Sequence, residues 1–240
     1  MSDKLKNRQK ADNRNRNKED ILAASLATCK LNFKCLWYKN ISSTNLRARQ
    51  IIEMSKLASD ETPSPKKDPV LIVADEQTNG KGQRGRNWHS PAKSGLWFSI
   101  LFYPELPLSK IPGLTIETAK AVQQFLHHTF SIKSKIKDPN DLLVNGKKIC
   151  GILAESDTIA GKYKPEFVII GTGLNIQTNF PKELSTIGTS VKEHYKGTIP
   201  PAEILIGKLI SKMVEIFPQE CFIPQTSMPC LCAEASKLAP

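Results

Sequence analysis

The sequence predicts an α+β fold in which a mixed β-sheet is flanked by helices. Apolar runs of strand length alternate with segments whose apolar residues recur every three or four positions, which is the spacing of one helix face. The connections between them are rich in glycine, proline and polar residues. With 240 residues, of which 40% are hydrophobic, the chain can bury one good core but not two ordinary domains.

We expect a cytoplasmic protein that does not bind membranes. No apolar run approaches the roughly 20 residues that a membrane helix needs, and the Lys/Asn-rich start lacks the apolar centre of a secretory signal. The cysteines form no C-x-x-C pair, so reduced and mostly buried thiols are expected rather than disulfides or a zinc site. They are Cys29, Cys35, Cys150, Cys221, Cys230 and Cys232.

The net charge of +11 is concentrated near the N-terminus. Residues 1–18 hold seven Lys/Arg and two Asp, which accounts for +5 of the total. This segment has almost no apolar side chains to bury in return for the entropy of ordering, so we expect residues 1–30 to be a basic, disordered tail. Within it, residues 19–29 are apolar enough for a short helix. A basic run like residues 1–18 is more often a solubilising tail than a specific nucleic-acid arm.

The first predicted elements are a strand and a helix. Residues 33–38 are rich in aromatics, as strands are, and Leu46–Leu57 places Ala48 and Ile52 on one helical face. The polar run Ser42–Asn45 precedes the helix and suits a helix start. Hydroxyl and N–H groups at such a start also suit a small polar ligand, and the two roles are compatible.

A glycine-rich loop joins the next two strands, Val70–Ala74 and Gly95–Tyr103, of which the second is the most apolar and is expected inside the sheet. Its glycines allow backbone N–H groups to approach an anion, and its cations add attraction. The spacing fits neither the Walker loop nor the dinucleotide fingerprint. The loop is a candidate phosphate or adenylate cradle, although Gly/Arg-rich turns are more often solvated hairpins. Its members are Gly80, Lys81, Gly82, Gln83, Arg84, Gly85 and Arg86.

A helix is predicted after the break at Pro104–Gly113. Ala119, Val122, Leu126 and Phe130 are spaced by three and four residues, which gives an amphipathic stripe that should pack on the sheet. The two histidines near its end are expected to cap the helix or to be exposed, rather than to be catalytic. Further on, Asn175 follows two glycines at the end of a buried strand, and glycines there mark a close approach of the backbone to another strand or a ligand.

Asn145-Gly146 between two apolar runs predicts a type I′ hairpin. The turn places Lys148 near the start of the returning strand and Asn140-Asp141 just before the outgoing one, so polar groups of both arms can face one pocket. A lysine at a strand end is usually solvated, and the spacing alone leaves that alternative open. A final helix, with apolar residues at every fourth position, completes the predicted order.

Four of these stretches, in this order, resemble the catalytic domain of biotin protein ligases. The resemblance covers the chain from about residue 33 to the helix that ends near residue 217. Each motif is modest alone, and their joint order and spacing is specific. The four are Ser43-Thr44-Asn45; the loop Gln77–Pro91 with Trp88-His-Ser-Pro; Lys137-x-Pro-Asn140-Asp141-Leu followed by Lys148-x-x-Gly-Ile-Leu; and Gly171-x-Gly-x-Asn175.

The resemblance implies a fold and a reaction. The fold is an α+β domain related to the class II aminoacyl-tRNA synthetases. In the reaction, biotin attacks the α-phosphate of ATP, which is bound with Mg²⁺, and gives biotinyl-5′-AMP and pyrophosphate. A lysine of a biotin carboxyl carrier protein, or of such a domain in a carboxylase, then accepts the biotin. Such an enzyme works by holding anions together and stabilising the charge that develops.

The resemblance also assigns roles to residues. Lys148 is the expected catalytic group, which would hold the biotin carboxylate and the α-phosphate, and Asn140 and Asp141 are the candidates for Mg²⁺. The expected biotin-binding residues are Ser43, Thr44, Asn45, Gln77, Lys81, Gly82, Gln83 and Lys148. The expected ATP- and phosphate-binding residues are Gly80, Arg84, Gly85, Arg86, Trp88, Lys137, Asn140, Asp141 and Asn175.

Three positions depart from the family pattern. Asp138 stands where the family usually has tryptophan, which removes an apolar surface and adds a negative charge near a site for anions. Arginine is frequent where Lys81 and Gln83 stand, so the loop lacks a bidentate guanidinium fork at these two positions. The resulting hypothesis is a leakier adenylate and labelling of non-cognate proteins.

The catalytic domain is expected at residues 31–218. About thirty residues precede the first matching strand, which is too few for the winged helix of some family members, so no specific DNA binding is expected. Residues 219–240 form a short tail, and the C-terminal β-barrel of other members is expected to be absent. The identity of the carrier and the formation of a homodimer are left open.

Other functions also stay open. A lipoate ligase or octanoyl transferase would share the fold but should carry less of the Gly-Lys-Gly-x-Arg-Gly-Arg-x-Trp loop. A degenerate ligase would only bind biotin. A basic nucleic-acid binder would depend on the tail and lose affinity with salt, but no exposed aromatic platform or recognition motif supports it.

Overall fold

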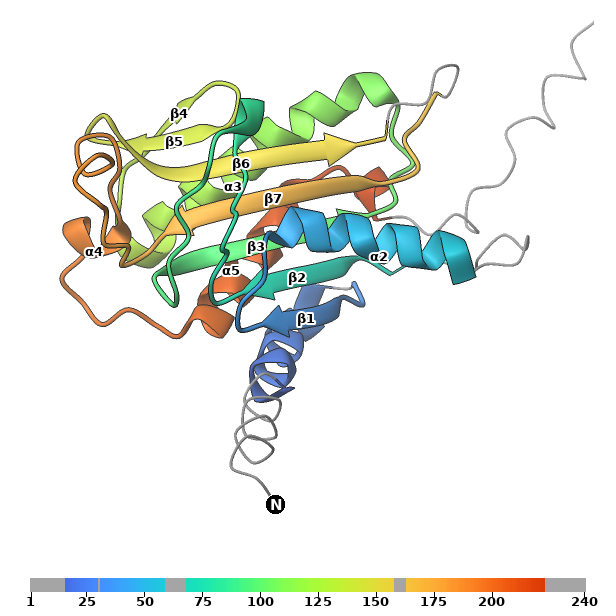
Figure 1. The fold of residues 1–240 in the computed structure, drawn as a ribbon, viewed down its shortest axis with the longest axis horizontal. Helices are drawn as coiled ribbons and strands as arrows, with labels where there is room; N and C mark the ends of the chain where they lie inside the picture. The colour runs from blue at the N-terminus through green and yellow to red at the C-terminus, as the bar shows by residue number, and fades with distance from the viewer. Residues whose placement is uncertain (1–15, 30, 59–67, 158–162, 223–240) are drawn as a thin grey trace, which may run out of the picture.

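Seven strands form one mixed sheet in the order β1-β2-β3-β7-β6-β5-β4 (Figure 1). The computed structural model describes residues 16–29, 31–58, 68–157 and 163–222. β1 and β2 are parallel, and every other pair of neighbours is antiparallel. The predicted mixed sheet is confirmed. The strands are β1 (Lys34–Tyr38), β2 (Val70–Ala74), β3 (Gly95–Phe102), β4 (Lys135–Lys137), β5 (Asp141–Val144), β6 (Lys147–Ser156) and β7 (Val168–Asn175).

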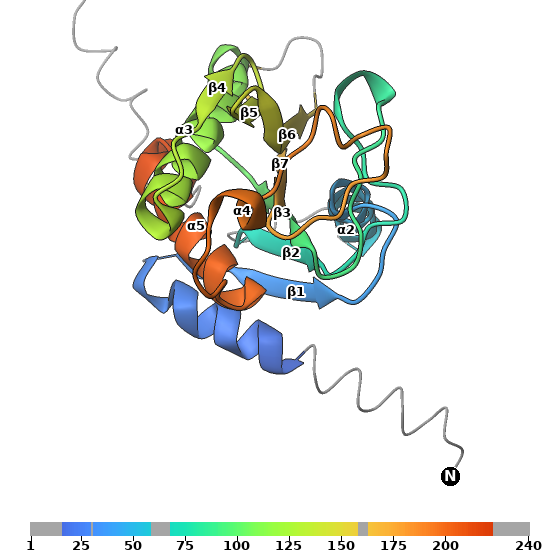
Figure 2. The same cartoon turned by 90° about the vertical axis from the view of Figure 1, so that its left-hand side faces the viewer.

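Helices cover both faces of the sheet. Figure 2 shows α2 on one side and α3 and α5 on the other. A helix at residues 16–26 precedes β1. In the described part of the chain, no helix is both long and apolar enough to cross a membrane. The helices and turns are η1 (Ala27–Cys29), α2 (Thr44–Ala58), η2 (Gln83–Gly85), η3 (Leu108–Lys110), α3 (Ile111–Phe130), α4 (Val191–His194), α5 (Ala202–Ile216) and η4 (Gln219–Cys221).

The connection from β1 through α2 to β2 positions the site. Two parallel neighbours need a crossover, and α2 supplies it on one face of the sheet. The N-terminus of α2 therefore lies near the carboxyl ends of β1 and β2. The glycine-rich loop leaves β2 at the same edge and returns through the antiparallel strand β3. A helix start and a loop rich in backbone N–H groups are thus brought together.

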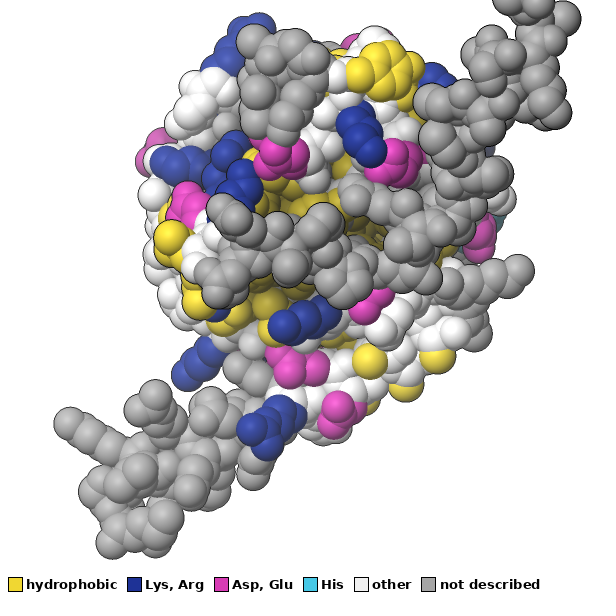
Figure 3. All heavy atoms as spheres, turned by 90° about the vertical axis from the view of Figure 1, so that its right-hand side faces the viewer, with side chains coloured by type: hydrophobic (Ala, Val, Ile, Leu, Met, Phe, Trp, Pro, Cys, Tyr) yellow, Lys and Arg dark blue, Asp and Glu magenta, His cyan; other side chains and the backbone are white. Residues whose placement is uncertain are grey.

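Charged side chains are interspersed on the described surface. Figure 3 shows one end of the molecule, where lysine and arginine side chains lie among aspartate and glutamate side chains. Arg49 of α2 pairs with Glu155 of β6, at 2.7 Å between nitrogen and oxygen. Lys56 pairs in the same way with Glu166, at 3.0 Å. These exposed pairs contribute little stability each.

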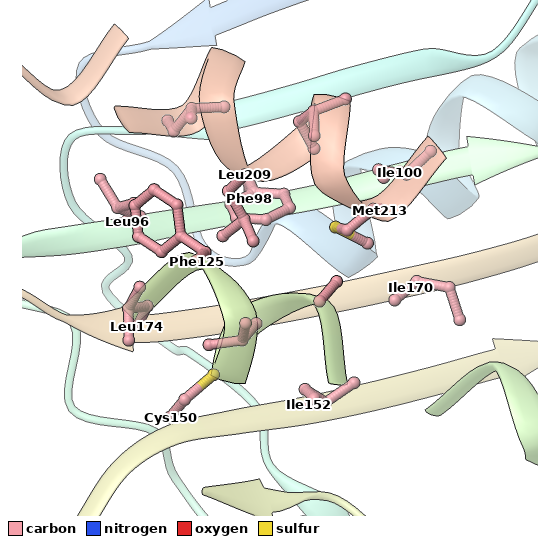
Figure 4. Close-up of a cluster of buried hydrophobic side chains, with 14 of the residues drawn as sticks. Leu96, Phe98, Ile100, Phe125, Cys150, Ile152, Ile170, Leu174, Leu209 and Met213 are labelled. Atoms are coloured by element: carbon pink, nitrogen blue, oxygen red, sulfur yellow. The ribbon is translucent and has the colours of Figure 1, made fainter. Parts of the chain in front are cut away.

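The main core lies between the sheet and the pair α3 and α5. Alternate residues of β3, Leu96, Phe98 and Ile100, are fully buried there. Figure 4 shows them with side chains of β6, β7 and both helices. Each large apolar side chain in this position contributes about 1.5–3 kcal/mol of burial free energy. The residues between them, Trp97 and Ser99, point to the opposite face, where α2 and the site lie.

The Asn145-Gly146 hairpin is confirmed. Asn145 has φ 50° and Gly146 has φ 79°, the two positive values that a type I′ turn requires. The start of α3 differs from the prediction, because the helix begins at Ile111, within the segment expected to be a loop. Pro112 lies in the first helical turn, where its missing N–H leaves no hydrogen bond unmade. The short strand β4 was not predicted.

The domain is longer than the predicted residues 31–218. In the segment assigned to a disordered tail, residues 16–26 are helical, and Leu22 and Leu26 are buried in the main core. The assignment is therefore wrong for this helix, whose apolar face packs on the core, while residues 1–15 lie outside the described residues. At the other end, Cys221 is buried and Phe222 packs against Phe102, so the core continues past residue 218.

The described cysteines are free thiols. Burial, with a smaller effect of Glu19, raises the pKa of Cys35 to about 11. Burial, with a smaller effect of Glu220, raises the pKa of Cys221 to about 12. The pKa of Cys150 is also raised by burial. These thiols stay protonated at neutral pH, and Cys230 and Cys232 lie outside the described residues.

Candidate active site

The glycine-rich loop is a hairpin. Trp88 N donates to Gly80 O at 2.9 Å, and Gly82 N donates to Arg86 O at 2.7 Å. Gly80 is required at its base, because a Cβ there would lie 2.5 Å from Trp88 O. At the tip, Arg84 has φ 56°, a left-handed conformation that few residues other than glycine adopt readily. The loop is thus built by backbone pairing below an exposed, cationic tip.

Gln77 connects this hairpin to the start of α2. Its Oε1 accepts from Thr44 N at 2.8 Å and from Thr44 Oγ1 at 3.2 Å. Its Nε2 donates to Ser90 Oγ at 2.9 Å. The amide oxygen therefore satisfies a first-turn N–H of α2, one of the helix groups that lack a partner within the helix. Because both ends of the amide are bonded, its orientation is fixed.

Ser99 holds the same helix start from below. Its Oγ lies 2.7 Å from Thr44 Oγ1 and 2.6 Å from Asn45 Oδ1, and the side chain is fully buried. Opposite Ser99 in the β3–β7 pair stands Gly171, where a Cβ would lie 2.2 Å from Asn45 Oδ1. This glycine, in the middle of β7, therefore marks a close approach of the backbone, and the group that approaches is a side chain of α2.

Trp88 lies across two paired glycines. Gly151 of β6 and Gly173 of β7 are partners in register. A Cβ at Gly173 would lie 2.2 Å from Trp88 Nε1, and one at Gly151 would lie 2.8 Å from the indole ring. The indole therefore packs where the two strands carry no side chain. Its buried Nε1 has no hydrogen-bond partner among the described residues.

A β-bulge turns Lys148 towards the site. In a regular strand Lys148 would share a face with Cys150, which lies in the main core. The register shifts between Leu142 and Leu143, so that Cys150 faces Leu142 while Lys148 faces Leu143. Ile149 is the extra residue, and it is buried beside Cys150. The alternation is thereby reset, and Lys148 shares the face of Gly151.

Lys148 is held by several groups. Its Nζ lies 2.6 Å from Asp141 Oδ1, and it stands 5.0 Å from the centre of a Trp88 ring. Its backbone N donates to Ile187 O at 2.7 Å, and its O accepts from Thr189 N at 3.0 Å. Asn175 Nδ2 also donates to Lys148 O, at 3.4 Å. The lysine therefore presents a positioned ammonium group with a third of its side chain exposed.

These elements line a pocket of about 430 Å³ that is open to solvent. All of the residues expected to bind biotin line it, and so do Trp88 and Asn140. Lys148 and the glycine-rich loop thus face one space, although they lie far apart in the sequence. The lining residues are Ser43, Thr44, Asn45, Gln77, Lys81, Gly82, Gln83, Trp88, Asn140, Lys148, Gly151, Ile152, Leu153, Gly171, Thr172 and Gly173.

Comparison with known proteins gives the family. Residues 46–175, more than half of the chain, match the model of the biotin/lipoate A/B protein ligase family. The chain belongs to this family. The lysine, the glycine-rich loop and the glycine pair that line the pocket all fall within the matched segment or within a few residues of it.

Curated relatives of this ligase-family chain include two bacterial proteins. The bifunctional ligase/repressor BirA of Bacillus subtilis is 38% identical over 161 residues, which are 66% of this chain and 46% of that protein. A biotin ligase of Mycobacterium tuberculosis, named for acetyl-CoA carboxylase, is 30% identical over 128 residues, which are 52% of this chain and 45% of that protein. The chain spans about half the length of these relatives.

Solved structures share the fold of the ligase-family chain. The biotin protein ligase of Aquifex aeolicus in complex with biotin and ATP has a TM-score of 0.59 and 26% identity, and the match covers 79% of this chain and 73% of that one. The biotin protein ligase of Leishmania major in complex with biotinyl-5-AMP has a TM-score of 0.59 and 23% identity, over 76% and 74% of the two chains. The predicted biotin-ligase-like catalytic fold is confirmed.

Some residues expected at the ATP site of this family member do not line the pocket. Gly80 is buried within the hairpin, while Arg84, Gly85 and Arg86 are exposed at the loop tip. Lys137 is exposed on β4. The other two, Asp141 and Asn175, instead contact Lys148. The lining of the pocket therefore does not support an ATP-binding role for these residues.

The residues expected to bind Mg²⁺ are engaged with protein groups. Asn140 Nδ2 donates to Ile152 O at 3.1 Å, and the Asp141 carboxylate pairs with Lys148. Over the described ranges, no three His, Cys, Asp or Glu side chains gather in a way that could hold a metal. Asp141 offers one carboxylate, which fits a Mg²⁺ that is bound mainly by substrate phosphates and water.

The sequence reasoning missed the hydroxyls that support the site. Ser99 stands alone among apolar residues in β3, and a lone polar residue in a buried strand must find a partner. That signal was available. Ser90, which accepts a hydrogen bond from Gln77, carried no such signal in the sequence. Nothing in the spacing shows that the two residues face each other across the hairpin.

Proposed function

We propose that the chain is an ATP-dependent biotin protein ligase. It forms biotinyl-5′-AMP and transfers the biotin to a lysine of a biotin carboxyl carrier protein or domain. One observation carries the proposal: Lys148, the loop residues Lys81–Gln83 and the polar start of α2 line a single pocket. The Aquifex aeolicus relative, which was solved with biotin and ATP, supports this choice of substrates.

The pocket has the polarity of biotin. The polar side chains Ser43, Thr44 and Asn45 are buried at one end, where they suit the ureido group, which both donates and accepts hydrogen bonds. The two paired glycines and the side chain of Leu153 offer an apolar middle for the ring sulfur and the alkyl chain. Lys148 offers an ammonium group for the carboxylate. Biotin has these three features in this order.

The same polarity argues against lipoate and octanoate. Neither acid has a group at its far end that bonds to hydroxyls and amides. Binding either one would displace water from the polar end of the pocket around Ser43 and Thr44 without giving it a hydrogen bond to the ligand in return, which disfavours such analogues. We therefore favour biotin over the other acids used within the family.

In the first step a carboxylate oxygen of biotin attacks the α-phosphorus of ATP. A phosphorus–oxygen bond to biotin forms, and the bond to pyrophosphate breaks with the electron pair leaving on pyrophosphate. Lys148 would hold the carboxylate and an α-phosphate oxygen together and stabilise the charge that develops, while Asp141 holds the ammonium group in place. When bound, Mg²⁺ would neutralise phosphate charge. The Asp141 carboxylate, which pairs with Lys148, would help to hold it.

In the second step the neutral amine of the carrier lysine attacks the carbonyl carbon of the mixed anhydride. A carbon–nitrogen bond forms, AMP leaves with the carbon–oxygen electron pair, and the amine loses a proton to solvent. The loop residues Lys81, Gly82 and Gln83, which line the pocket, would keep the anhydride shielded from water until the carrier arrives.

The test is ATP/pyrophosphate exchange with the full chain, with biotin, lipoate and octanoate in parallel. We expect exchange with biotin alone, followed by labelling of a purified carrier domain. Exchange driven by lipoate or octanoate, with none from biotin, would reassign the chain to another branch of the family. Binding of biotin without any exchange would reduce it to a biotin-binding protein.

A further inference from the structure

The N-terminal helix at residues 16–26 reaches the base of the glycine-rich loop. Lys18 Nζ lies 2.6 Å from Asp75 Oδ1 and 4.5 Å from the centre of a Trp37 ring. The indole Nε1 of Trp37 donates to the same carboxylate oxygen at 2.8 Å. The Asp75 side chain is only 10% exposed. A carboxylate so far from water depends on these two partners.

A neighbouring contact fixes the helix on the edge of the sheet. Glu19 Oε1 accepts from Trp37 N at 2.6 Å. β1 is the edge strand, and this N–H would otherwise point away from the sheet without a strand partner. Because Glu19 bonds the backbone of Trp37 while Lys18 covers its ring, the helix is held at a defined height along β1.

Asp75 begins the loop and bonds to the residue that ends it. It follows β2 directly, and its N donates to Tyr38 O at 2.8 Å. Its O accepts from Lys93 N, also at 2.8 Å, and Lys93 has φ 55°. Asp75 and Lys93 therefore close residues 76–92 into one unit at a single point. Gln77, which orients the start of α2, is two residues further along the chain.

We propose that Lys18 is a positioning residue for the pocket. Through Asp75 it fixes the base of the glycine-rich loop, and through that base it fixes the amide of Gln77. The link to the pocket rests on the proposed biotin site, whereas the link to the loop does not. Without Lys18, the Asp75 carboxylate keeps one indole partner and gains stability by moving towards water, which loosens the loop base.

The experiment compares Lys18→Met with Lys18→Arg and with Lys120→Met in the full chain. The arginine retains the charge, and Lys120 pairs with Glu117 on the exposed side of α3, so its loss removes an equivalent charge far from the loop. One readout is the rate of trypsin cleavage after Arg84 or Arg86 without ligand, measured by mass spectrometry of the fragments. The other is the Kd for biotin from calorimetry.

For Lys18→Met we expect cleavage of the loop to accelerate about fivefold, as for a segment that opens more often. We expect the biotin Kd to rise about tenfold, the effect of losing one charge-assisted contact in the chain of bonds to Gln77. Lys18→Arg should restore both values, and Lys120→Met should leave them unchanged. Asp75→Asn should behave as Lys18→Met, and combining the two should add little.

The outcomes separate the two proposals. Equal cleavage rates in Lys18→Met and Lys120→Met would overturn the positioning of the loop. Faster cleavage with an unchanged biotin Kd would overturn the link from the loop base to Gln77. If the wild-type chain binds no biotin, the proposed function fails, and the cleavage rates alone decide the role of Lys18. A changed melting temperature without either effect would mark Lys18 as merely structural and would also overturn the proposal.

Discussion

Lys148 Nζ and Asp141 Oδ1 lie 2.6 Å apart across the β5–β6 pair, on the face of the sheet that carries the pocket. Both side chains are partly exposed, at 32% and 22%. A pair of this kind holds the ammonium group in place without removing it from water. An incoming carboxylate or phosphate can therefore share Lys148 with Asp141, and the pair prepares the lysine for an anionic ligand.

Replacing Lys148 by alanine should lower adenylate formation by about a hundredfold or more, which is the usual effect of removing one preorganised electrostatic contact. Biotin-dependent pyrophosphate exchange measures this step. Lys147→Ala is the matched control, because Lys147 is the adjacent residue and its Nζ donates to Ser185 O. Undiminished exchange in Lys148→Ala would remove the role assigned to Lys148.

A methyl group at Gly173 should displace Trp88. The new Cβ would lie 2.2 Å from Trp88 Nε1, a distance that forces the indole to move. We expect Gly173→Ala to weaken biotin binding by about tenfold or more and to change the tryptophan fluorescence. Gly113→Ala is the control, since nothing lies within 4 Å of a Cβ there and alanine favours the helix. Wild-type affinity in Gly173→Ala would show that Trp88 does not shape the pocket.

Removing the Ser99 hydroxyl should reduce stability by about 1–3 kcal/mol, because Asn45 Oδ1 loses a buried donor. Urea denaturation of Ser99→Ala measures the loss. Ser109→Ala, at an exposed position in η3, should change stability by less than about 0.5 kcal/mol. Equal denaturation midpoints in the two variants would contradict the bonding described for Ser99.

Alkaline pH should destabilise the protein through its buried thiols. The pKa of Cys35 is about 11 when folded against 9.0 as the ordinary value, mainly because of burial. A raised pKa means that the folded state binds the proton more tightly, so its stabilising effect is complete below pH 9 and is lost as the pH rises towards 11. Urea midpoints between pH 8 and pH 11 should fall less steeply in Cys35→Ala than in the wild type. Parallel slopes would assign the alkaline loss to other groups.

Gln83→Arg should limit the escape of the adenylate. Gln83 lines the pocket beside Lys81, and arginine would add a cation with a planar fork for phosphate. We expect labelling of an added non-carrier protein to fall about fivefold relative to carrier labelling, because a tighter grip slows release of the reactive intermediate. Gln50→Arg, on the exposed side of α2, controls for the added charge. Carrier-limited labelling by the wild type would itself refute the leak.

The sequence predicted those parts of the fold that local chemistry decides. Val70–Ala74 is a strand within the same limits, and Asn145-Gly146 forms the expected turn, because apolar runs and turn residues act over a few positions. The direction of Lys148 could not be predicted, since the bulge at Ile149 depends on pairing with Leu142 and Leu143. Alternation alone would have placed the lysine in the core.

The N-terminal helix illustrates a second limit. Its apolar residues indicated a helix, but nothing in the pattern indicated the surface on which it packs. The partners of Lys18 and Glu19 are Asp75 and Trp37, which are distant in the chain and carry no periodic relation to the helix. Contacts of this kind arise only when the strands are assembled. Without them, a charged terminal segment is easily interpreted as a tail.

The bulge at Ile149 decides which face of the sheet carries the Lys148 side chain. If the bulge were lost while every residue was kept, strict alternation would put Lys148 on the face of Cys150 and point its ammonium group into hydrocarbon, with every motif still present in the sequence. Anyone who grafts this hairpin must therefore conserve its bulge as carefully as its lysine.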